Sequence, residues 1–153
     1  MLFRYFGQQA AWERKGFRFK MPIKLLDSTL VSLTISVYDW AHYTTSKGAV
    51  KMHTLLDYDC LLPEFMNITG GKRTDNKAAF DIEIKPHSIV VADRGYCDYG
   101  LLNHWDSNNV FYVVRHKDDI QHRTIKELPF PEKHAQNVLL DEIIEFELPT
   151  AKD

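Results

Sequence analysis

Hydrophobic and polar side chains alternate along much of the first half of the chain, which is the pattern of strands that bury one face. The segment IKLLDSTLVSLTI, residues 23–35, is rich in β-branched residues and predicts the first strand. Residues 50–56 and 65–69 predict a second and a third strand, separated by a turn at DYDC. Gly70 and Gly71 end the third strand, so this half predicts a three-stranded meander.

The pattern changes in the second half, where helical segments alternate with short apolar runs. Asp75 predicts the N-cap of a helix that continues to about Ile84. Residues 88–93, SIVVAD, form an apolar, β-branched run that ends in an aspartate, as expected for a strand buried on both faces. Asp98 predicts the cap of a second helix, and residues 110–115 predict the strand that follows it.

Alternation returns near the end of the chain, where residues 142–148, EIIEFEL, predict another strand. The expected order is therefore β-β-β-α-β-α-β, followed by further strands. A meander followed by helical crossovers implies an α/β fold with a mixed sheet, because each crossover connects parallel strands.

The composition fits one globular domain, with 153 residues of which 44% are hydrophobic and 26% charged. The net charge of −2 argues against a nucleic-acid partner, but the charges are unevenly distributed. Residues 1–24 carry six basic residues against one acid, and residues 132–153 carry six acids against two lysines. A basic surface hidden by the average and an ordinary solvated mosaic of charges explain this distribution equally well.

The two cysteines, Cys60 and Cys97, lie far apart and match neither a zinc-binding spacing nor a disulfide framework. A reducing, cytoplasmic compartment is therefore expected. No apolar run approaches the roughly 20 residues of a membrane span. The N-terminal sequence also lacks the apolar stretch of a signal peptide.

Two aspartates are singled out by their positions in the predicted strands. Asp27 lies inside an apolar strand, where an unpaired carboxylate is costly to bury. Asp93 ends a buried strand, at the edge where open α/β sheets bind their ligands. If the two strands are neighbours, the carboxylates converge and offer hard oxygen ligands to Mg²⁺ or Mn²⁺. Without further context, a turn or cap role for Asp27 and an ordinary strand end at Asp93 are the simpler interpretations.

Five motifs, taken together, change this balance: LLDSTLVSL, SKGAVKMHTLLDYD, LPEFMNITGGKRTDNKAAF, VVADRGYCDYGLL and FYVVRHK. In this order and at these spacings they resemble the DDE transposases of bacterial insertion sequences. The resembling group inserts a mainly β-stranded subdomain between its second and third catalytic acids. The resemblance extends from about Phe17 to Glu147, and although each motif alone is only moderately specific, five in order are a strong signal.

The resemblance implies a ribonuclease-H-like fold and a transposase that hydrolyses phosphodiesters and transfers strands in cut-and-paste transposition. Asp27 and Asp93 match the first two metal-binding acids, which in the intact family hold two Mg²⁺ or Mn²⁺ ions. Residues 1–22 would form a lead-in helix or extended segment, 23–117 a partial catalytic core, and 118–153 part of the β insertion. DNA, both transposon ends and target, is the implied partner, and the implied location is the bacterial cytoplasm at the nucleoid.

Five basic residues fall near the expected catalytic edge or the base of the insertion: Lys47, Lys51, Arg94, Arg115 and Lys117. The resemblance implies that Arg94 and Arg115 contact the DNA backbone. Such contacts provide affinity without reading sequence. For any single lysine or arginine, a solvated surface charge is the alternative interpretation.

The resemblance also implies a third acid that this sequence does not match. In the family it is a Glu in a Tyr-Arg-Glu-Lys-like signature on a helix after the β insertion, whereas Glu142, Glu145 and Glu147 lie on a strand pattern. The expectation is a fragment that is truncated at both ends and inactive alone. Two alternatives remain: a non-enzymatic remnant that binds DNA or associates with itself or with full-length transposase, and a nuclease whose third acid lies within this chain.

Overall fold

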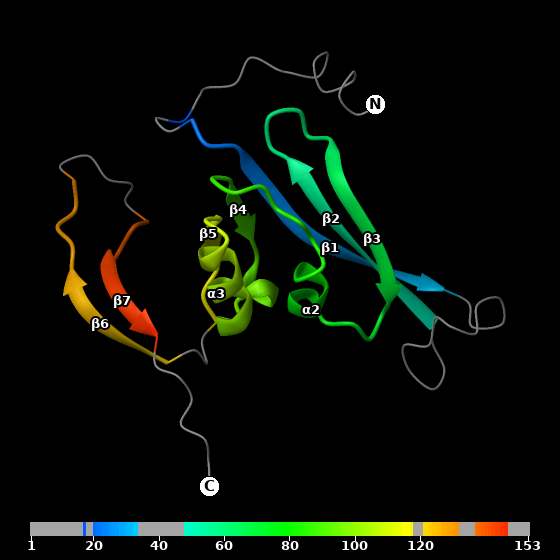
Figure 1. The fold of residues 1–153 in the computed structure, drawn as a ribbon. Helices are drawn as coiled ribbons and strands as arrows, with labels where there is room; N and C mark the ends of the chain where they lie inside the picture. The colour runs from blue at the N-terminus through cyan, green and yellow to red at the C-terminus, as the bar shows by residue number, and fades with distance from the viewer. Residues whose placement is uncertain (1–16, 18–19, 34–47, 118–120, 132–136, 147–153) are drawn as a thin grey trace, which may run out of the picture. The chain divides into compact units, whose positions relative to one another are not determined.

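A computed structural model describes residues 17, 20–33, 48–117, 121–131 and 137–146 (Figure 1). The chain divides into two compact units, Met1–Arg115 and His116–Asp153, and each is described here by itself. Most of the lead-in segment expected at residues 1–22 lies outside the described residues. Among the residues that are described, no helix is long and apolar enough to cross a membrane.

The first unit is built on a five-stranded sheet with the order β3-β2-β1-β4-β5. β1, β2 and β3 form an antiparallel meander, whereas β4 runs parallel to β1 and β5 runs parallel to β4. The strand order predicted from the sequence, a meander followed by crossover strands, is confirmed. The bounds of the strands are β1 Ile23–Leu33, β2 Gly48–Asp57, β3 Pro63–Gly70, β4 Ile89–Ala92 and β5 Phe111–Val114.

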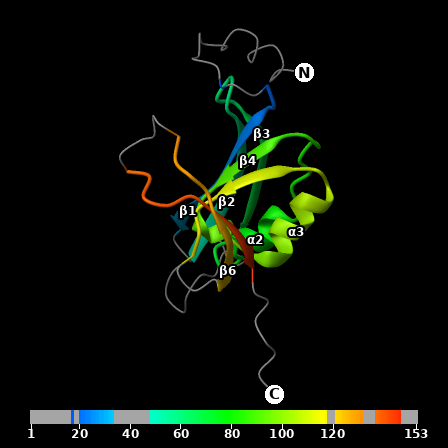
Figure 2. The ribbon, with the colours of Figure 1, turned by 90° about the vertical axis from the view of Figure 1, so that its left-hand side faces the viewer.

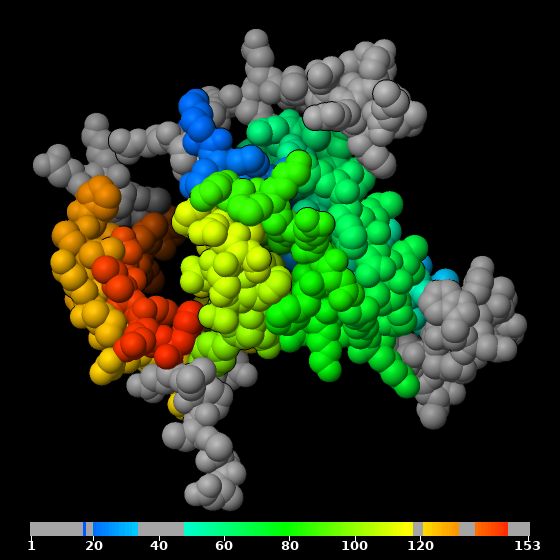
Figure 3. All heavy atoms as spheres, viewed as in Figure 1, coloured from blue at the N-terminus to red at the C-terminus, as the bar shows by residue number. Residues whose placement is uncertain are grey.

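Two helices, α2 (Asp75–Ala79) and α3 (Tyr99–Ser107), lie on the same side of this sheet (Figure 2). Their side chains cover the strands in the space-filling view (Figure 3). The core lies between the helices and the sheet, where Trp105 of α3 is 2% exposed and its ring contacts that of Tyr112 on β5.

The opposite face of the sheet is open within the described residues. Because side chains alternate along a strand, the residues between the buried ones point to this second face. Four large apolar side chains on this face are more than half exposed, namely Met66, Ile68, Phe111 and Val113. The sheet therefore has one packed face and one apolar face that no described element covers.

Helix α3 begins where the sequence predicts. The Asp98 carboxylate accepts a hydrogen bond from the backbone N–H of Leu101 at 3.1 Å, which satisfies an otherwise unpaired donor of the first turn. Its other oxygen accepts from the side-chain amide of Asn76 in α2 at 3.0 Å. Asn109, with φ of 57°, follows the end of the helix in the left-handed conformation that asparagine tolerates. The predicted cap at Asp98 is confirmed.

The predicted helix from Asp75 to Ile84 is wrong in its length and in its cap. α2 ends at Ala79, and its N-cap is Thr74, which makes no side-chain cap hydrogen bond. After the helix, Ile82 and Ile84 are buried while the residues next to them are exposed. This spacing of two buries both isoleucines only if the chain is extended, so packing ends the helix early.

The second unit contains an antiparallel pair of strands, β6 (His122–Glu127) and β7 (Glu142–Phe146). The strand predicted from the alternation at residues 142–148 is confirmed as β7. Cross-strand contacts join the pair, with Arg123 bonded to Glu145 at 2.5 Å and the Thr124 hydroxyl bonded to Glu142 at 3.2 Å.

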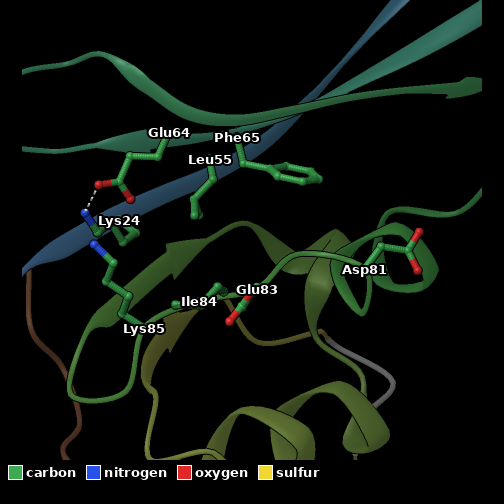
Figure 4. Close-up of a pocket in the computed structure, with 8 residues that line it drawn as sticks. All are labelled: Lys24, Leu55, Glu64, Phe65, Asp81, Glu83, Ile84 and Lys85. Atoms are coloured by element: carbon green, nitrogen blue, oxygen red, sulfur yellow. Dashed lines mark hydrogen bonds and ion pairs between the residues drawn. The ribbon is translucent and has the colours of Figure 1, made fainter. Parts of the chain in front are cut away.

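A lysine is buried at the start of β1. Lys24 is 5% exposed, and its ammonium group lies 2.7 Å from Asp57 and 2.7 Å from Glu64. Lys24 and Glu64 line a cavity of about 520 Å³, which Lys85 also lines (Figure 4). Burial lowers the pKa of Lys24, but the hydrogen bonds to the two carboxylates outweigh it, so this pKa is raised above 10.5.

The pKa of the partner carboxylate, Asp57, shifts in the opposite direction. Burial raises the pKa of Asp57, but the hydrogen bonds from Lys24 and from the backbone N–H of Cys60 outweigh it and lower this pKa below 3.8. Stability from Asp57 is therefore present above pH 3.8 and is lost as the pH falls through the lower folded value. Stability from Lys24 is present below pH 10.5 and is lost as the pH rises through the higher folded value.

Lys24→Met is expected to lower the free energy of unfolding at pH 7 by about 1–3 kcal/mol, because it leaves the partly buried Asp57 carboxylate without its charged donor. The difference from the unsubstituted protein should shrink below pH 3.8, where Asp57 becomes protonated. Urea unfolding at pH 7 and pH 3 measures both effects. Lys85→Met is the matched control, because Lys85 lines the same cavity but is exposed, and a pH-independent loss in Lys24→Met would contradict the interpretation.

Candidate active site

The two aspartates singled out in the sequence lie on neighbouring strands. β1 and β4 are parallel, and their register pairs Leu26 with Ala92. Asp27 directly follows Leu26, and Asp93 directly follows Ala92. The two aspartates are therefore neighbours across the sheet, at the carboxyl end of β4. The prediction that they lie on adjacent parallel strands is confirmed, and both side chains are exposed.

The expectation that the Asp27 carboxylate is buried inside an apolar strand is wrong. Leu26 is 3% exposed and Ser28 bonds to Asp75 of α2, so both point to the helix-covered face. Asp27 lies between them and points to the opposite face, which the described residues leave open. Its carboxylate therefore avoids the desolvation penalty expected for a buried charge and is accessible to a ligand.

Asp93 is fixed by the turn that follows it. Its Oδ1 accepts a hydrogen bond of 2.9 Å from the backbone N–H of Gly95, which caps the short 3₁₀ helix η2 (Arg94–Tyr96). The carboxylate therefore has a defined orientation although the residue is exposed. One oxygen is held by the chain itself, as is required of a pre-organised ligand.

A third carboxylate, which the sequence analysis treated only as a helix cap, lies beside this pair. Asp75 Oδ1 accepts a hydrogen bond of 2.6 Å from the Ser28 hydroxyl and lies 3.1 Å from the Lys51 ammonium. A Cβ added to Gly95 would lie 3.0 Å from Asp93 Oδ1 and 3.3 Å from Asp75 Oδ2, so the two carboxylates flank this glycine. The only sequence signal for this role was the polar Ser28 on the buried face of a strand.

The charges of all three aspartates act on one buried hydroxyl group. Tyr96 is 1% exposed, and burial is the largest cause that raises its pKa well above 10.0. The negative charges of Asp75, Asp27 and Asp93 raise the pKa further, in that order. Tyr96 is therefore a neutral phenol at physiological pH, and the site combines an uncharged hydroxyl with three carboxyl groups.

His53 is a structural residue of the first unit. It is 0% exposed, and its Nε2 lies 3.0 Å from the Thr69 hydroxyl. Burial lowers its pKa, although Asp75, 3.7 Å from Nδ1, acts in the other direction. A neutral ring that accepts the Thr69 O–H at Nε2 presents its Nδ1–H to the Asp75 carboxylate.

The basic residues predicted to contact DNA fall into three groups. Arg94 and Arg115 are exposed, and the backbone N–H of Arg115 bonds to the Ala92 carbonyl at 3.4 Å, which places it at the same sheet edge as Asp93. Lys51 is half-buried and paired with Asp75. Lys117 belongs to the second unit, and Lys47 lies outside the described residues.

The residues present at this edge fit a divalent metal ion. Mg²⁺ and Mn²⁺ take hard oxygen ligands and are commonly bound by one or two carboxylates together with water and phosphate oxygens. Asp27 and Asp93 provide such a pair. In the part of the chain that the structure describes, no group of three or more His, Cys, Asp or Glu side chains is placed to hold a metal ion.

A mixed sheet in the order 3-2-1-4-5 with aspartates at the end of its central parallel pair defines an α/β domain of the ribonuclease-H-like class. The chain belongs to the transposase DDE domain family, whose model matches residues 18–147. Membership confirms the resemblance to insertion-sequence transposases that the motifs indicated.

Two bacterial proteins are similar to this chain in sequence. The chain is 28% identical over 108 residues to a protein of Geobacillus stearothermophilus described as a transposase for insertion sequence element IS5377. It is 27% identical over 105 residues to a protein of Sinorhizobium fredii described as transposase y4zB. These matches cover 71% and 69% of this chain but only 28% and 29% of the relatives.

Among solved structures, the chain is similar to the piggyBac transposase in a synaptic complex with hairpin DNA. The match has a TM-score of 0.44 and 8% sequence identity, and it covers 63% of this chain and 23% of the other.

Mn²⁺ is expected to raise the midpoint of thermal unfolding of this protein, because an ion that binds only the folded state stabilises it. The gain at 100 times Kd is about 2.7 kcal/mol. Asp93→Ala should abolish the Mn²⁺-dependent increase, and Asp106→Ala, which removes an exposed aspartate from α3, should retain it. Differential scanning calorimetry with and without Mn²⁺ measures the shift, and an equal increase in all three proteins would contradict binding at Asp93.

Proposed function

We propose that this chain is the front part of the catalytic core of a DNA transposase, which hydrolyses and joins phosphodiester bonds with divalent metal ions. One observation carries the proposal: in a member of this family, two exposed aspartates directly follow Leu26 and Ala92, the last paired residues of two adjacent parallel strands. The substrates would be the ends of a mobile element and its target DNA, encountered in the cytoplasm.

Asp27 and Asp93 would hold the Mg²⁺ or Mn²⁺ ions. When bound, such ions lower the pKa of an attacking water or 3′-hydroxyl and stabilise the leaving oxygen. The chain's own contribution is orientation: Asp27 is fixed in a strand hydrogen-bonded on both sides, and Asp93 is fixed by the N–H of Gly95. The reaction needs carboxylates because the metals, rather than a side-chain base, activate the nucleophile.

Arg94 and Arg115 would bind the phosphate backbone next to the scissile bond. Both are exposed at the edge that carries Asp93, and contacts of this kind position DNA without reading its sequence. Lys47 and Lys117 are further candidates for phosphate contacts. Lys51 is left out of this set because its ammonium group is already paired with Asp75.

The third carboxylate of the family would have to approach from the open face of the sheet. Asp27 points to this face and lies opposite Thr54, which in turn pairs with the exposed Met66. Glu142 and Glu145 are engaged within the second unit, with Thr124 and Arg123. We therefore assign only two of the three catalytic acids to this chain and leave Glu147, outside the described residues, without a role.

A second candidate function is association with a full-length transposase, or with a second copy, without catalysis. The observation that favours it is the exposure of apolar side chains in the second unit, since unburied apolar surface commonly marks an interaction site. These side chains are Ile125, Leu139, Leu140 and Ile143.

The purified protein is expected to bind DNA weakly, with steep salt dependence, and to show no detectable strand cleavage or joining with Mn²⁺. A missing third carboxylate should reduce the occupancy of one metal position. Loss of one positioned electrostatic group already costs about 10²–10³ in rate, or roughly 2.7–4 kcal/mol. A nicking assay on DNA that carries the element's ends tests this.

Asp93→Ala is the control for the nicking assay. Robust cleavage that disappears in Asp93→Ala would overturn the incomplete site and indicate a third acid within the chain, with Glu142 and Glu145 the first to substitute. Cleavage that survives Asp93→Ala would indicate a contaminating nuclease, and further purification would then have to remove it.

A further inference from the structure

A buried polar network runs beneath the two exposed aspartates. Asp75, at the start of α2, receives the Ser28 hydroxyl from β1 at 2.6 Å and the Lys51 ammonium from β2 at 3.1 Å. Behind it, His53 of β2 lies 3.7 Å from the same oxygen and 3.0 Å from the Thr69 hydroxyl of β3. These five residues, the Asp75 network, connect three strands and a helix around one carboxylate.

The Asp75 network reaches both metal-ligand candidates. Ser28 directly follows Asp27 in β1, so the hydrogen bond to Asp75 fixes the strand next to the first aspartate. On the other side, Asp75 and Asp93 both approach Gly95. A Cβ added to Gly95 would lie 3.3 Å from Asp75 Oδ2 and 3.0 Å from Asp93 Oδ1. The Gly95 N–H in turn holds Asp93 at 2.9 Å.

The environment of Asp75 suits an anchor better than a ligand. Its Oδ1 is occupied by a hydroxyl donor and an ammonium group, and its side chain is 24% exposed, whereas Asp27 and Asp93 belong to exposed residues. A metal ion bound to Asp75 would have to displace Lys51 or share its charge. Groups that hold metal ligands in place, rather than bind the metal, typically change affinity 10–100-fold when substituted.

We propose that Asp75 is a positioning residue that fixes Asp27, through Ser28, and Asp93, through the Gly95 turn, in the positions from which they would bind a divalent metal ion. The metal role of Asp27 and Asp93 rests on the function proposed above, but the positional role is a property of the metal-free protein.

Asp75→Asn tests the proposal, because it keeps an oxygen for Ser28 and removes the charge that pairs with Lys51. Asp81→Asn is the matched control. It removes the carboxylate of an exposed aspartate that follows α2 and pairs with Arg73. In the metal-free protein, Asp75→Asn should shift the ¹³C carboxyl resonances of Asp27 and Asp93 and accelerate exchange of the Gly95 amide, while Asp81→Asn leaves all three unchanged.

Mn²⁺ affinity, measured by electron paramagnetic resonance, is the second measurement. Asp75→Asn should weaken binding about 10-fold, and Asp93→Ala should abolish it. Gly95→Ala, which places a methyl group between the two carboxylates without removing either, should weaken binding in the same way as Asp75→Asn.

The outcomes separate the two proposals. If metal-free Asp75→Asn matches Asp81→Asn in all three signals, the positioning role is overturned, whatever the Mn²⁺ result. If Asp75→Asn abolishes Mn²⁺ binding without moving those signals, Asp75 is a ligand and the positioning role is again overturned. If the unsubstituted protein binds no Mn²⁺ but Asp75→Asn still moves the Asp27 and Asp93 resonances, the positioning role is supported and the metal function fails.

Discussion

The parallel pairing of β1 with β4 is the constraint on which the site depends. β1 occupies the centre of the sheet, with the meander on one side and the crossover strands on the other. Its register with β4 places Asp27 one step beyond Leu26 and Asp93 one step beyond Ala92. A slip of one residue would turn Asp27 to the helix-covered face, because successive side chains point to opposite faces. The hydrogen bond from the Ile89 N–H to the Pro22 carbonyl extends this pairing beyond the strand.

The sequence predicted those features that depend on local patterns. Alternation and β-branched runs identified the strands, and Asp98 was recognised as a cap because its role involves only neighbours in the chain. The extent of α2 was not predictable in this way. The choice between a longer helix and an extended segment depends on where Ile82 and Ile84 find a core, which is a tertiary property.

The candidate site shows the same division. Asp27 and Asp93 were found from their strand positions, but the role of Asp75 was missed because its partners, Ser28 and Lys51, come from strands distant in the sequence. Lys24 likewise counted as one of the basic residues near the N-terminus, whereas the fold buries it between two carboxylates. Charge counts along a chain cannot separate charges consumed by packing from charges left for a ligand.

The net charge of −2 is therefore no argument against the DNA partner proposed for this chain. Lys24 and Lys51 form ion pairs with acids inside the fold. The same ion pairs neutralise some of the acids that contribute to the negative net charge. Arg94 and Arg115 are exposed beside Asp93, and under the proposed function they are the cations that would meet phosphate at this edge. The relevant quantity for a nucleic-acid partner is the field at one edge, which the average conceals.

The two faces of the sheet differ in packing, and this difference bears on whether Asp27 and Asp93 suffice for a metal site. The helix-covered face is packed and holds the Asp75 network, whereas the face to which Asp27 points carries exposed apolar side chains such as Met66 and Val113. Full burial of one such side chain contributes roughly 1.5–3 kcal/mol. A segment that covered this face would thus gain stability and bring its own side chains next to Asp27, which is where the proposed function requires a further carboxylate. Under that proposal, the same contact would stabilise the sheet and complete the metal site.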